Sequence, residues 1–207
     1  MEGRSNIMRQ GVSPDAAPSR FWSLPNTLTY GRIIAIPALV ACFFATGDWG
    51  RWTAMWIFIA AGVSDFLDGY LARAWQLQSA VGRMLDPIAD KLIVAAALLM
   101  LAADQTIAGW SLWAGVIILC REILVSGLRE FLGSLAVGVP VTRLAKWKTV
   151  VQMVAIGFLL ADSAGDKIWP YTTLFGLTLL WIAALLTLYT GYDYLRAAIR
   201  HVNTEEE

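Results

Sequence analysis

Charged residues are scarce in this sequence, at only 15% of its 207 positions. A soluble domain usually carries about 25%, so the ordinary soluble class is excluded first. The 16 Lys and Arg residues balance the 16 Asp and Glu residues, so net charge gives no reason to expect nucleic acid as a partner. The two cysteines, Cys42 and Cys120, lie inside apolar runs, which indicates neither a disulfide framework nor a cysteine metal site.

Long runs of apolar residues make up much of the sequence. Hydrophobic residues make up 57% of the chain, and a transmembrane helix needs about 20 residues that are mostly apolar. Six stretches are candidates, at 28–45, 52–72, 87–103, 107–128, 148–162 and 169–192. We therefore predict an all-α integral membrane protein with six transmembrane helices.

The distribution of Lys and Arg predicts how this protein lies in the membrane. With the N-terminus inside, 14 of the 16 Lys and Arg residues fall on the inner side, and only Arg51 and Lys167 fall outside. Positive charge is enriched on the cytoplasmic side of membrane proteins. Most of the tryptophans lie near predicted helix ends, the depth that amphipathic rings prefer. Both termini are therefore predicted in the cytosol, and the location is a cell (inner) membrane.

The apolar pattern also predicts the domain organisation. Residues 1–21 form a polar N-terminal lead, 22–200 form a single six-helix domain, and 201–207 form an acidic tail. The sequence shows no internal repeat. We expect no signal peptide, because the first long apolar run starts only near Leu28.

Four aspartates gather at the cytoplasmic ends of the second and third predicted helices. Asp65 and Asp68 are three residues apart, and Asp86 and Asp90 are four apart, so each pair shares one helical face. Four neighbouring carboxylates repel one another unless cations lie between them. Carboxylate oxygens suit Mg²⁺, Mn²⁺ or Ca²⁺, and two such ions could clamp the attacking and leaving oxygens of a phosphoryl transfer.

The residues between the aspartates favour a phosphate ligand. Gly69 and Gly82 allow backbone or ligand to approach closely, and Ala72 keeps its helical face open. Arg73 offers a fork of donors that matches phosphate geometry. The alternative is that all these residues are packing positions and helix-end charges, which explains one aspartate more easily than four.

The spacing of these residues resembles a family signature. The chain reads D-F-L-D-G-Y-L-A-R from Asp65, then eight residues, then G-R-M-L-D-P-I-A-D. This is similar, at every fixed position, to the D-x2-D-G-x2-A-R-x8-G-x3-D-x3-D signature of the CDP-alcohol phosphotransferases. Those proteins are six-helix membrane enzymes, usually homodimers, that move a phosphatidyl or similar group from a CDP-linked donor to an alcohol and release CMP.

The resemblance implies a role for each motif position. Asp65, Asp68 and Asp86 would bind Mg²⁺ or Mn²⁺, two ions in all, and Asp90 would also reach one ion and act as general base. CDP would lie against Gly69, Ala72, Arg73 and Gly82. The only histidine, His201, is in the polar tail, so a carboxylate is the natural base.

Three further segments are similar to those of bacterial phosphatidylglycerophosphate synthases within this family. The first starts P-N-T-L-T at Pro25, and in it Asn26 and Thr29 would reach the nucleotide or its phosphates, although local helix capping also explains both residues. The others contain the cations Arg121, Arg129, Lys146 and Lys148. Here Ala145 replaces the usual Gly before Lys146.

These cations predict an anionic acceptor. A helix N-terminus with lysines favours anions, so the acceptor phosphate would bind there, although a cytosolic basic patch can also be a topology signal. The resemblance implies transfer of a phosphatidyl group from CDP-diacylglycerol to glycerol 3-phosphate, at a site facing the cytosol.

Three alternatives stay open at this point. A sibling enzyme would use another acceptor, such as inositol phosphate, serine or a phosphatidylglycerol. An intramembrane aromatic prenyltransferase would normally need two separated aspartate-rich motifs and more helices. A divalent-cation transporter would need polar residues continuing toward the outer face, where the predicted helices are almost purely apolar.

Overall fold

The protein, seen here in a computed structural model, is described over residues 24–75, 80–134 and 143–205. Within these ranges the side chains at 24–28, 68–75, 80–84, 134, 143, 145, 193–194 and 197–205 are not described. The described residues form six α-helices and no strand, which confirms the all-α prediction. The helices are α1 (Leu24–Cys42), α2 (Asp48–Trp75), α3 (Ala80–Ala103), α4 (Ser111–Ser134), α5 (Arg143–Asp166) and α6 (Thr172–Glu205).

Three of these helices are long and apolar enough to cross a membrane, by length and composition. The spans are Ser111–Gly133 in α4, Lys146–Asp166 in α5 and Thr172–Tyr192 in α6. A shorter apolar stretch, Thr29–Cys42, makes up most of α1. The helical content and these spans are those expected of a membrane protein.

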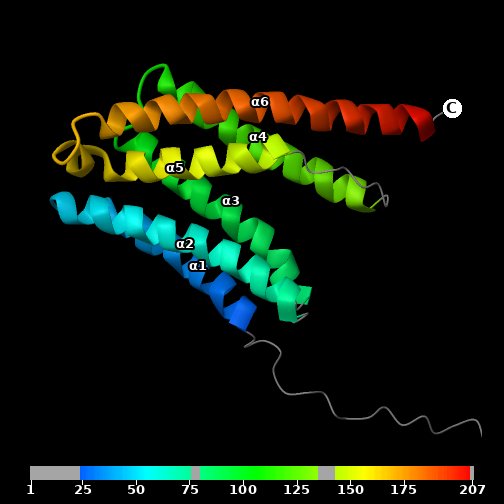
Figure 1. Cartoon of the computed structure of the whole chain (residues 1–207), viewed down its shortest axis with the longest axis horizontal. Coiled ribbons are helices and arrows are strands. Elements are labelled where there is room, and N and C mark those ends of the chain that lie inside the picture. Colours follow the sequence, from blue (N-terminus) through cyan, green and yellow to red (C-terminus); the bar gives the residue numbers. More distant parts are fainter. Residues whose placement is uncertain (1–23, 76–79, 135–142, 206–207) are drawn as a thin grey trace, which may run out of the picture.

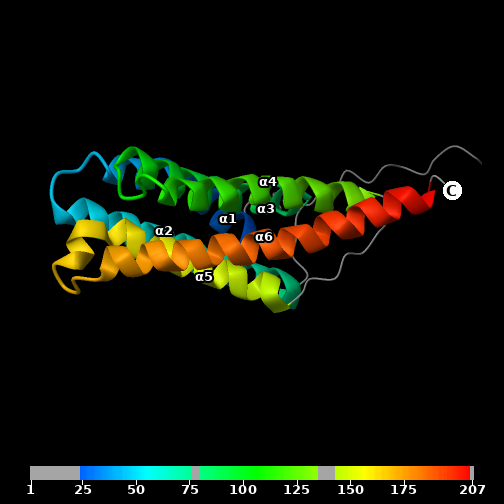
Figure 2. The same ribbon diagram turned by 90° about the horizontal axis from the view of Figure 1, so that it is seen from above.

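Helix α1 joins two helices that scarcely touch. It packs against both α2 and α3, whereas α2 and α3 make few contacts with each other. Helix α2 also packs against α5, and α6 lies against α5 and α4. Figure 1 shows that α1, α3 and α5 begin, and α2, α4 and α6 end, on one side of the molecule. In Figure 2, α4 and α5 flank α6.

The helices extend beyond the apolar runs that predicted them. Helix α3 begins at Ala80 and α5 at Arg143, and α6 continues to Glu205, so much of the predicted 73–86 connection and of the acidic tail is helical. Hydropathy reports the length in contact with lipid, whereas a helix continues as long as its backbone hydrogen bonds and neighbours support it. The extension at the start of α3 carries Asp86 of the motif, whereas Asp65 and Asp90 lie inside the predicted runs 52–72 and 87–103.

The core lies between the helices and is made of aliphatic and small side chains. Phe58, Leu101, Ile118, Leu159 and Leu180 are at most 1% exposed, and they come from α2, α3, α4, α5 and α6 in turn. Small residues let helices approach closely inside membranes. At the α1–α2 hairpin, a Cβ added at Gly50 would lie only 2.5 Å from the backbone oxygen of Cys42.

The close approach at Gly50 gives a stability prediction. Gly50→Ala should destabilise the fold by about 1–3 kcal/mol, as overpacking does, because a backbone oxygen cannot rotate away from the new methyl group. Gly115→Ala is the matched control, since a Cβ at Gly115 meets nothing within 4 Å and alanine is the better helix former. Thermal unfolding in detergent should show a lower Tm for Gly50→Ala only. Equal melting of the two variants would contradict the packing argument.

Polar residues pair with one another at the opposite end of the molecule from the motif. Arg51 contacts Asp104, lies 3.4 Å from Asp162, and places its guanidinium 5.0 Å from the centre of the Phe43 ring. Lys167 lies 2.6 Å from Asp48. The two cations predicted to lie outside are therefore both engaged by carboxylates. These ion pairs connect the start of α2 to the ends of α3 and α5.

Helix α6 begins at a local cap. Asp166 accepts hydrogen bonds from the backbone N–H (3.0 Å) and the hydroxyl (2.7 Å) of Thr173, which satisfies donors that a helix N-terminus leaves unpaired. One turn earlier, Asp162 has φ 40° and ψ −126° inside α5. The predicted fifth apolar run ends at this same residue.

Candidate active site

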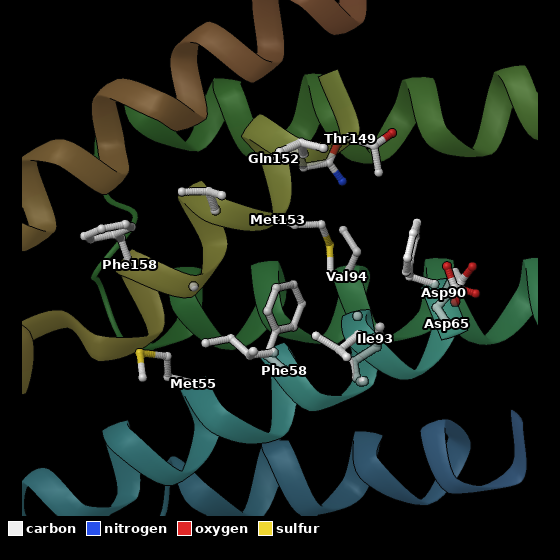
Figure 3. Close-up of a pocket in the computed structure, with 18 of the residues that line it drawn as sticks. Met55, Phe58, Asp65, Asp90, Ile93, Val94, Thr149, Gln152, Met153 and Phe158 are labelled. Atoms are coloured by element: carbon white, nitrogen blue, oxygen red, sulfur yellow. The ribbon is translucent and has the colours of Figure 1, made fainter. Parts of the chain in front are cut away.

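A buried arginine on α1 lies at the centre of the motif carboxylates. Arg32 is 2% exposed. Its Nη1 is 2.7 Å from Asp65 Oδ1 on α2 and also donates to Asp90 on α3. Its Nη2 donates to Asp86 Oδ1 over 3.2 Å. One guanidinium therefore draws together carboxylates from two helices that make little direct contact. Figure 3 shows Asp65 and Asp90 side by side.

Helical spacing explains how side chains of α1 and α3 meet. Thr29 and Arg32 are three residues apart on α1, and Asp86 and Asp90 are four apart on α3, so each pair presents one face. The buried hydroxyl of Thr29 donates to Asp86. Thr29 thus holds a motif carboxylate from the α1 side.

The charge of this cluster favours divalent cations. When Asp65, Asp86 and Asp90 are ionised, their three charges exceed that of Arg32 by two. The carboxylates are still partly open to solvent, with side chains 35–45% exposed. Oxygen ligands of this kind suit Mg²⁺ or Mn²⁺. The donor set therefore fits the cofactor that the sequence predicts.

Arg32 determines how far apart the carboxylate oxygens of Asp65, Asp86 and Asp90 lie. Among the described residues, no three His, Cys, Asp or Glu side chains are grouped closely enough to hold a metal ion. The guanidinium lies between the carboxylates and takes an oxygen of each. A divalent cation would bind the second oxygen of these carboxylates or share the first with Arg32. Asp68, the fourth predicted ligand, lies outside the described side chains.

A long cavity of about 1100 Å³ leads away from the carboxylates. Asp65, Asp86 and Asp90 line it at one end, and the opposite end reaches Trp169 and Thr172. Between them the walls are largely apolar and come from α2, α3 and α5 (Figure 3). A polar end beside an apolar channel is the shape expected for a ligand with a charged head and a lipid tail.

The α4 and α5 cations predicted to bind the acceptor divide into two groups. Lys148 is 3% exposed and pairs with Glu122, while Arg121 lies 3.6 Å from Glu122 and donates to Thr190 over 2.9 Å. Arg129 is exposed and lines the cavity together with Glu122. Lys146 is exposed at the start of α5. The structure thus brings Arg129 into the same cavity as the aspartates and ties Arg121 and Lys148 to Glu122.

Three residues of this site have no predicted role from the sequence: Arg32, Glu122 and Gln152. Arg32 stands out in hindsight as a charge inside an apolar helix, which usually marks function. Glu122 and Gln152 lie close in sequence to the predicted cations Arg121 and Lys148 but carry no positive charge themselves. The side chains of Asn26, Gly69, Ala72, Arg73 and Gly82, like that of Asp68, lie outside the described residues, so their predicted contacts stay predictions.

The family identity follows from comparison with known sequences. Residues 22–189 match the family described as CDP-alcohol phosphatidyltransferase. The chain belongs to this family. The match covers both halves of the signature and all six helices in whole or in part, so the resemblance seen in the motif is confirmed. The CDP-alcohol phosphatidyltransferases are transferases, and this chain is therefore an enzyme of that class.

Individual relatives are similar over most of the chain. A protein of Cereibacter sphaeroides named CDP-diacylglycerol–glycerol-3-phosphate 3-phosphatidyltransferase is 41% identical over 89% of this chain and 99% of its own length. One of Rickettsia bellii with the same name is 44% identical over 86% of this chain and 97% of its own. A rice protein named cardiolipin synthase (CMP-forming) is 38% identical over 90% of this chain and 61% of its own.

Proposed function

We propose that this chain transfers the phosphatidyl group of CDP-diacylglycerol to glycerol 3-phosphate, giving phosphatidylglycerophosphate and CMP. The observation that carries the proposal is the 41–44% identity, over nearly whole chains, to relatives named for this reaction. The structure adds a carboxylate cluster and a basic residue, Arg129, on one cavity. A metal-binding end and an anion-binding group in one cavity suit a charged donor and a phosphorylated acceptor.

The donor diphosphate is assigned to the motif end of the cavity. Mg²⁺ or Mn²⁺, as two ions held by Asp65, Asp68, Asp86 and Asp90, would neutralise charge on the diphosphate and on the departing CMP. The nucleotide is assigned to a set of residues on α1, α2 and α3: Asn26, Thr29, Gly69, Ala72, Arg73 and Gly82. Thr29 also fixes Asp86 through its hydroxyl. The acyl chains extend along the apolar part of the cavity.

Asp90 is assigned as the general base. It takes the proton of the 1-hydroxyl of glycerol 3-phosphate, and that oxygen attacks the phosphorus bearing diacylglycerol. The new P–O bond forms as the bond to CMP breaks, and CMP departs with the electron pair. Arg32 holds one oxygen of Asp90 and leaves the other for the proton. Positioning the reactants in this way supplies much of the rate of such a transfer.

The acceptor phosphate is assigned to Arg129 and Lys146, with Arg121 and Lys148 behind them. Glu122 holds Arg121 and Lys148 in place, and its carboxylate also keeps the acceptor region from becoming uniformly positive. A phosphate bound at Arg129 would lie in the cavity that Asp90 also lines. This arrangement selects a phosphorylated alcohol over a neutral one.

The membrane arrangement follows from the charge bias. In the proposed arrangement all six helices cross the inner membrane, and both termini and the active site face the cytosol. The resemblance to a family of usual homodimers, rather than the charge, supports a homodimer. The soluble acceptor reaches the site from the cytosol, and the lipid donor enters from the bilayer. Lys and Arg enrichment on the motif side supports the orientation.

A second candidate reaction uses phosphatidylglycerol as the acceptor. It is favoured by the 38% identity to the rice cardiolipin synthase. That acceptor carries its phosphate as a diester and brings two more acyl chains. The exposed cations Arg129 and Lys146 favour the monoester of glycerol 3-phosphate instead.

An acceptor panel tests the proposal. Purified protein in lipid–detergent micelles receives CDP-diacylglycerol and Mg²⁺, and CMP release is measured with one acceptor at a time: glycerol 3-phosphate, inositol, inositol phosphate, serine or phosphatidylglycerol. We expect release with glycerol 3-phosphate, abolished by EDTA. Release only with phosphatidylglycerol would replace the proposal with the second candidate. No release with any acceptor would overturn both candidate reactions. It would favour an intramembrane prenyltransferase or a divalent-cation transporter instead.

A further inference from the structure

A buried amide on α5 lines the cavity with an unsatisfied oxygen. Gln152 is 3% exposed, and its Oε1 has no hydrogen-bond partner in the described part of the chain. Gln152 lines the same cavity as Asp65 and Asp90. Figure 3 shows it on α5 beside Thr149, across the cavity from the helix that carries Phe58.

An unsatisfied buried carbonyl is costly, which makes this position informative. Buried polar side-chain atoms almost always have a partner, and an exception needs an explanation. A ligand with a hydrogen-bond donor would supply the missing partner for Oε1. The amide is already surrounded by protein, so a bound donor group would gain a partner without ordering a flexible side chain.

The chemistry of the proposed substrates limits which hydrogen-bond donor could pair with Oε1 of Gln152. The diacylglycerol part of the donor carries ester oxygens and hydrocarbon, which offer no hydrogen to Oε1. The ribose and cytosine do carry donors, but the residues assigned to them lie on α1, α2 and α3. Glycerol 3-phosphate has two hydroxyls, of which one reacts at Asp90. The second hydroxyl remains.

The position of Gln152 on α5 fits this hydroxyl. Gln152 lines the cavity that Arg129 and Asp90 also line, and these are the residues assigned to the phosphate and to the reacting hydroxyl of the acceptor. An acceptor held at these two points has its second hydroxyl on the carbon between them, free to reach a third side chain of the same cavity. We propose that Gln152 Oε1 accepts a hydrogen bond from the 2-hydroxyl of the acceptor and so selects acceptors that carry it. This inference rests on the proposed function.

Substrate discrimination follows from the same geometry. A site built to hydrogen-bond a hydroxyl rejects the analogue that lacks it, because its own polar group is then left unpaired. The analogue here is 3-hydroxypropyl phosphate, which retains the reacting hydroxyl and the phosphate. The ratio of kcat/KM for the two acceptors therefore measures what Gln152 contributes.

The test compares this ratio in three proteins of full length. Wild type should prefer glycerol 3-phosphate by at least about tenfold. Gln152→Met, which keeps the volume but removes the oxygen, should bring the ratio close to one, chiefly by raising KM for glycerol 3-phosphate. Val151→Ala is the control, because Val151 packs against the core rather than lining the cavity. Its ratio should match that of wild type.

The possible outcomes separate the inference from the proposed function. An unchanged ratio in Gln152→Met, with both acceptors slowed equally, overturns the inference and leaves the proposed function standing. A wild type that does not distinguish the two acceptors does the same. No CMP release by wild type with glycerol 3-phosphate overturns the proposed function itself. If Gln152→Met melts far below wild type, Gln152→Asn, which withdraws the amide by one methylene, should lower the ratio part-way.

Discussion

Asp90→Asn should lower kcat by about 10²–10⁴-fold, the usual contribution of a positioned base. The amide keeps an oxygen that can accept from Arg32 but cannot take the proton of the acceptor hydroxyl. KM for both substrates should change much less than kcat. Steady-state CMP release with glycerol 3-phosphate, together with metal-dependent binding of CDP-diacylglycerol, separates the two effects.

A matched substitution controls for the loss of one aspartate charge. Asp104 pairs with Arg51 at the opposite end of the molecule, so Asp104→Asn should turn over at nearly the wild-type rate. Near-normal turnover in Asp90→Asn would remove Asp90 as the base. Loss of donor binding together with kcat would instead assign it mainly to the metal site.

Arg32→Met should cost about 3–5 kcal/mol of stability, the range found when one partner of a buried ion network is removed. The methionine fills similar space but leaves the carboxylates of Asp65, Asp86 and Asp90 to repel one another on two helices that make few contacts with each other. Added Mg²⁺ should recover part of the lost stability, because the same oxygens are suitable ligands. Thermal unfolding with EDTA and with Mg²⁺ measures both effects.

Two controls separate charge from geometry in this experiment. Arg32→Lys keeps the charge but replaces the planar fork with a single ammonium group, so it should melt between wild type and Arg32→Met. Arg196→Met changes an exposed arginine near the end of α6 and should melt as wild type does. An Arg32→Met protein with a wild-type Tm in EDTA would contradict the role of Arg32 as the centre of the cluster.

The hydropathy pattern predicts the number and order of the helices but not where they end. Each of the six apolar stretches coincides largely with one helix. The polar extensions, such as the start of α3 at Ala80, could not be read from a pattern that reports contact with lipid. The bend at Asp162 likewise depends on local backbone geometry and on contacts with Arg51 and Thr173.

The sequence predicts the site residues that belong to one linear motif. It does not predict the contacts that form where three helices meet. The spacing of Asp65, Asp86 and Asp90 predicts that these residues act together, and the structure brings them to one guanidinium. Arg32 counts as one more inner-side cation in the sequence, because its burial depends on α1 packing between α2 and α3. The pairing of Lys148 with Glu122 depends in the same way on how α5 meets α4.

The most direct test of the central claim follows the phosphorus atom that moves. CDP-diacylglycerol labelled in the phosphate next to diacylglycerol is incubated with glycerol 3-phosphate, Mg²⁺ and the purified protein, and the label is followed in the lipid and aqueous products. We expect labelled phosphatidylglycerophosphate and an equal amount of unlabelled CMP, with neither formed by Asp90→Asn. Label released in the aqueous nucleotide, or no labelled phosphatidylglycerophosphate from active wild-type protein, would contradict it.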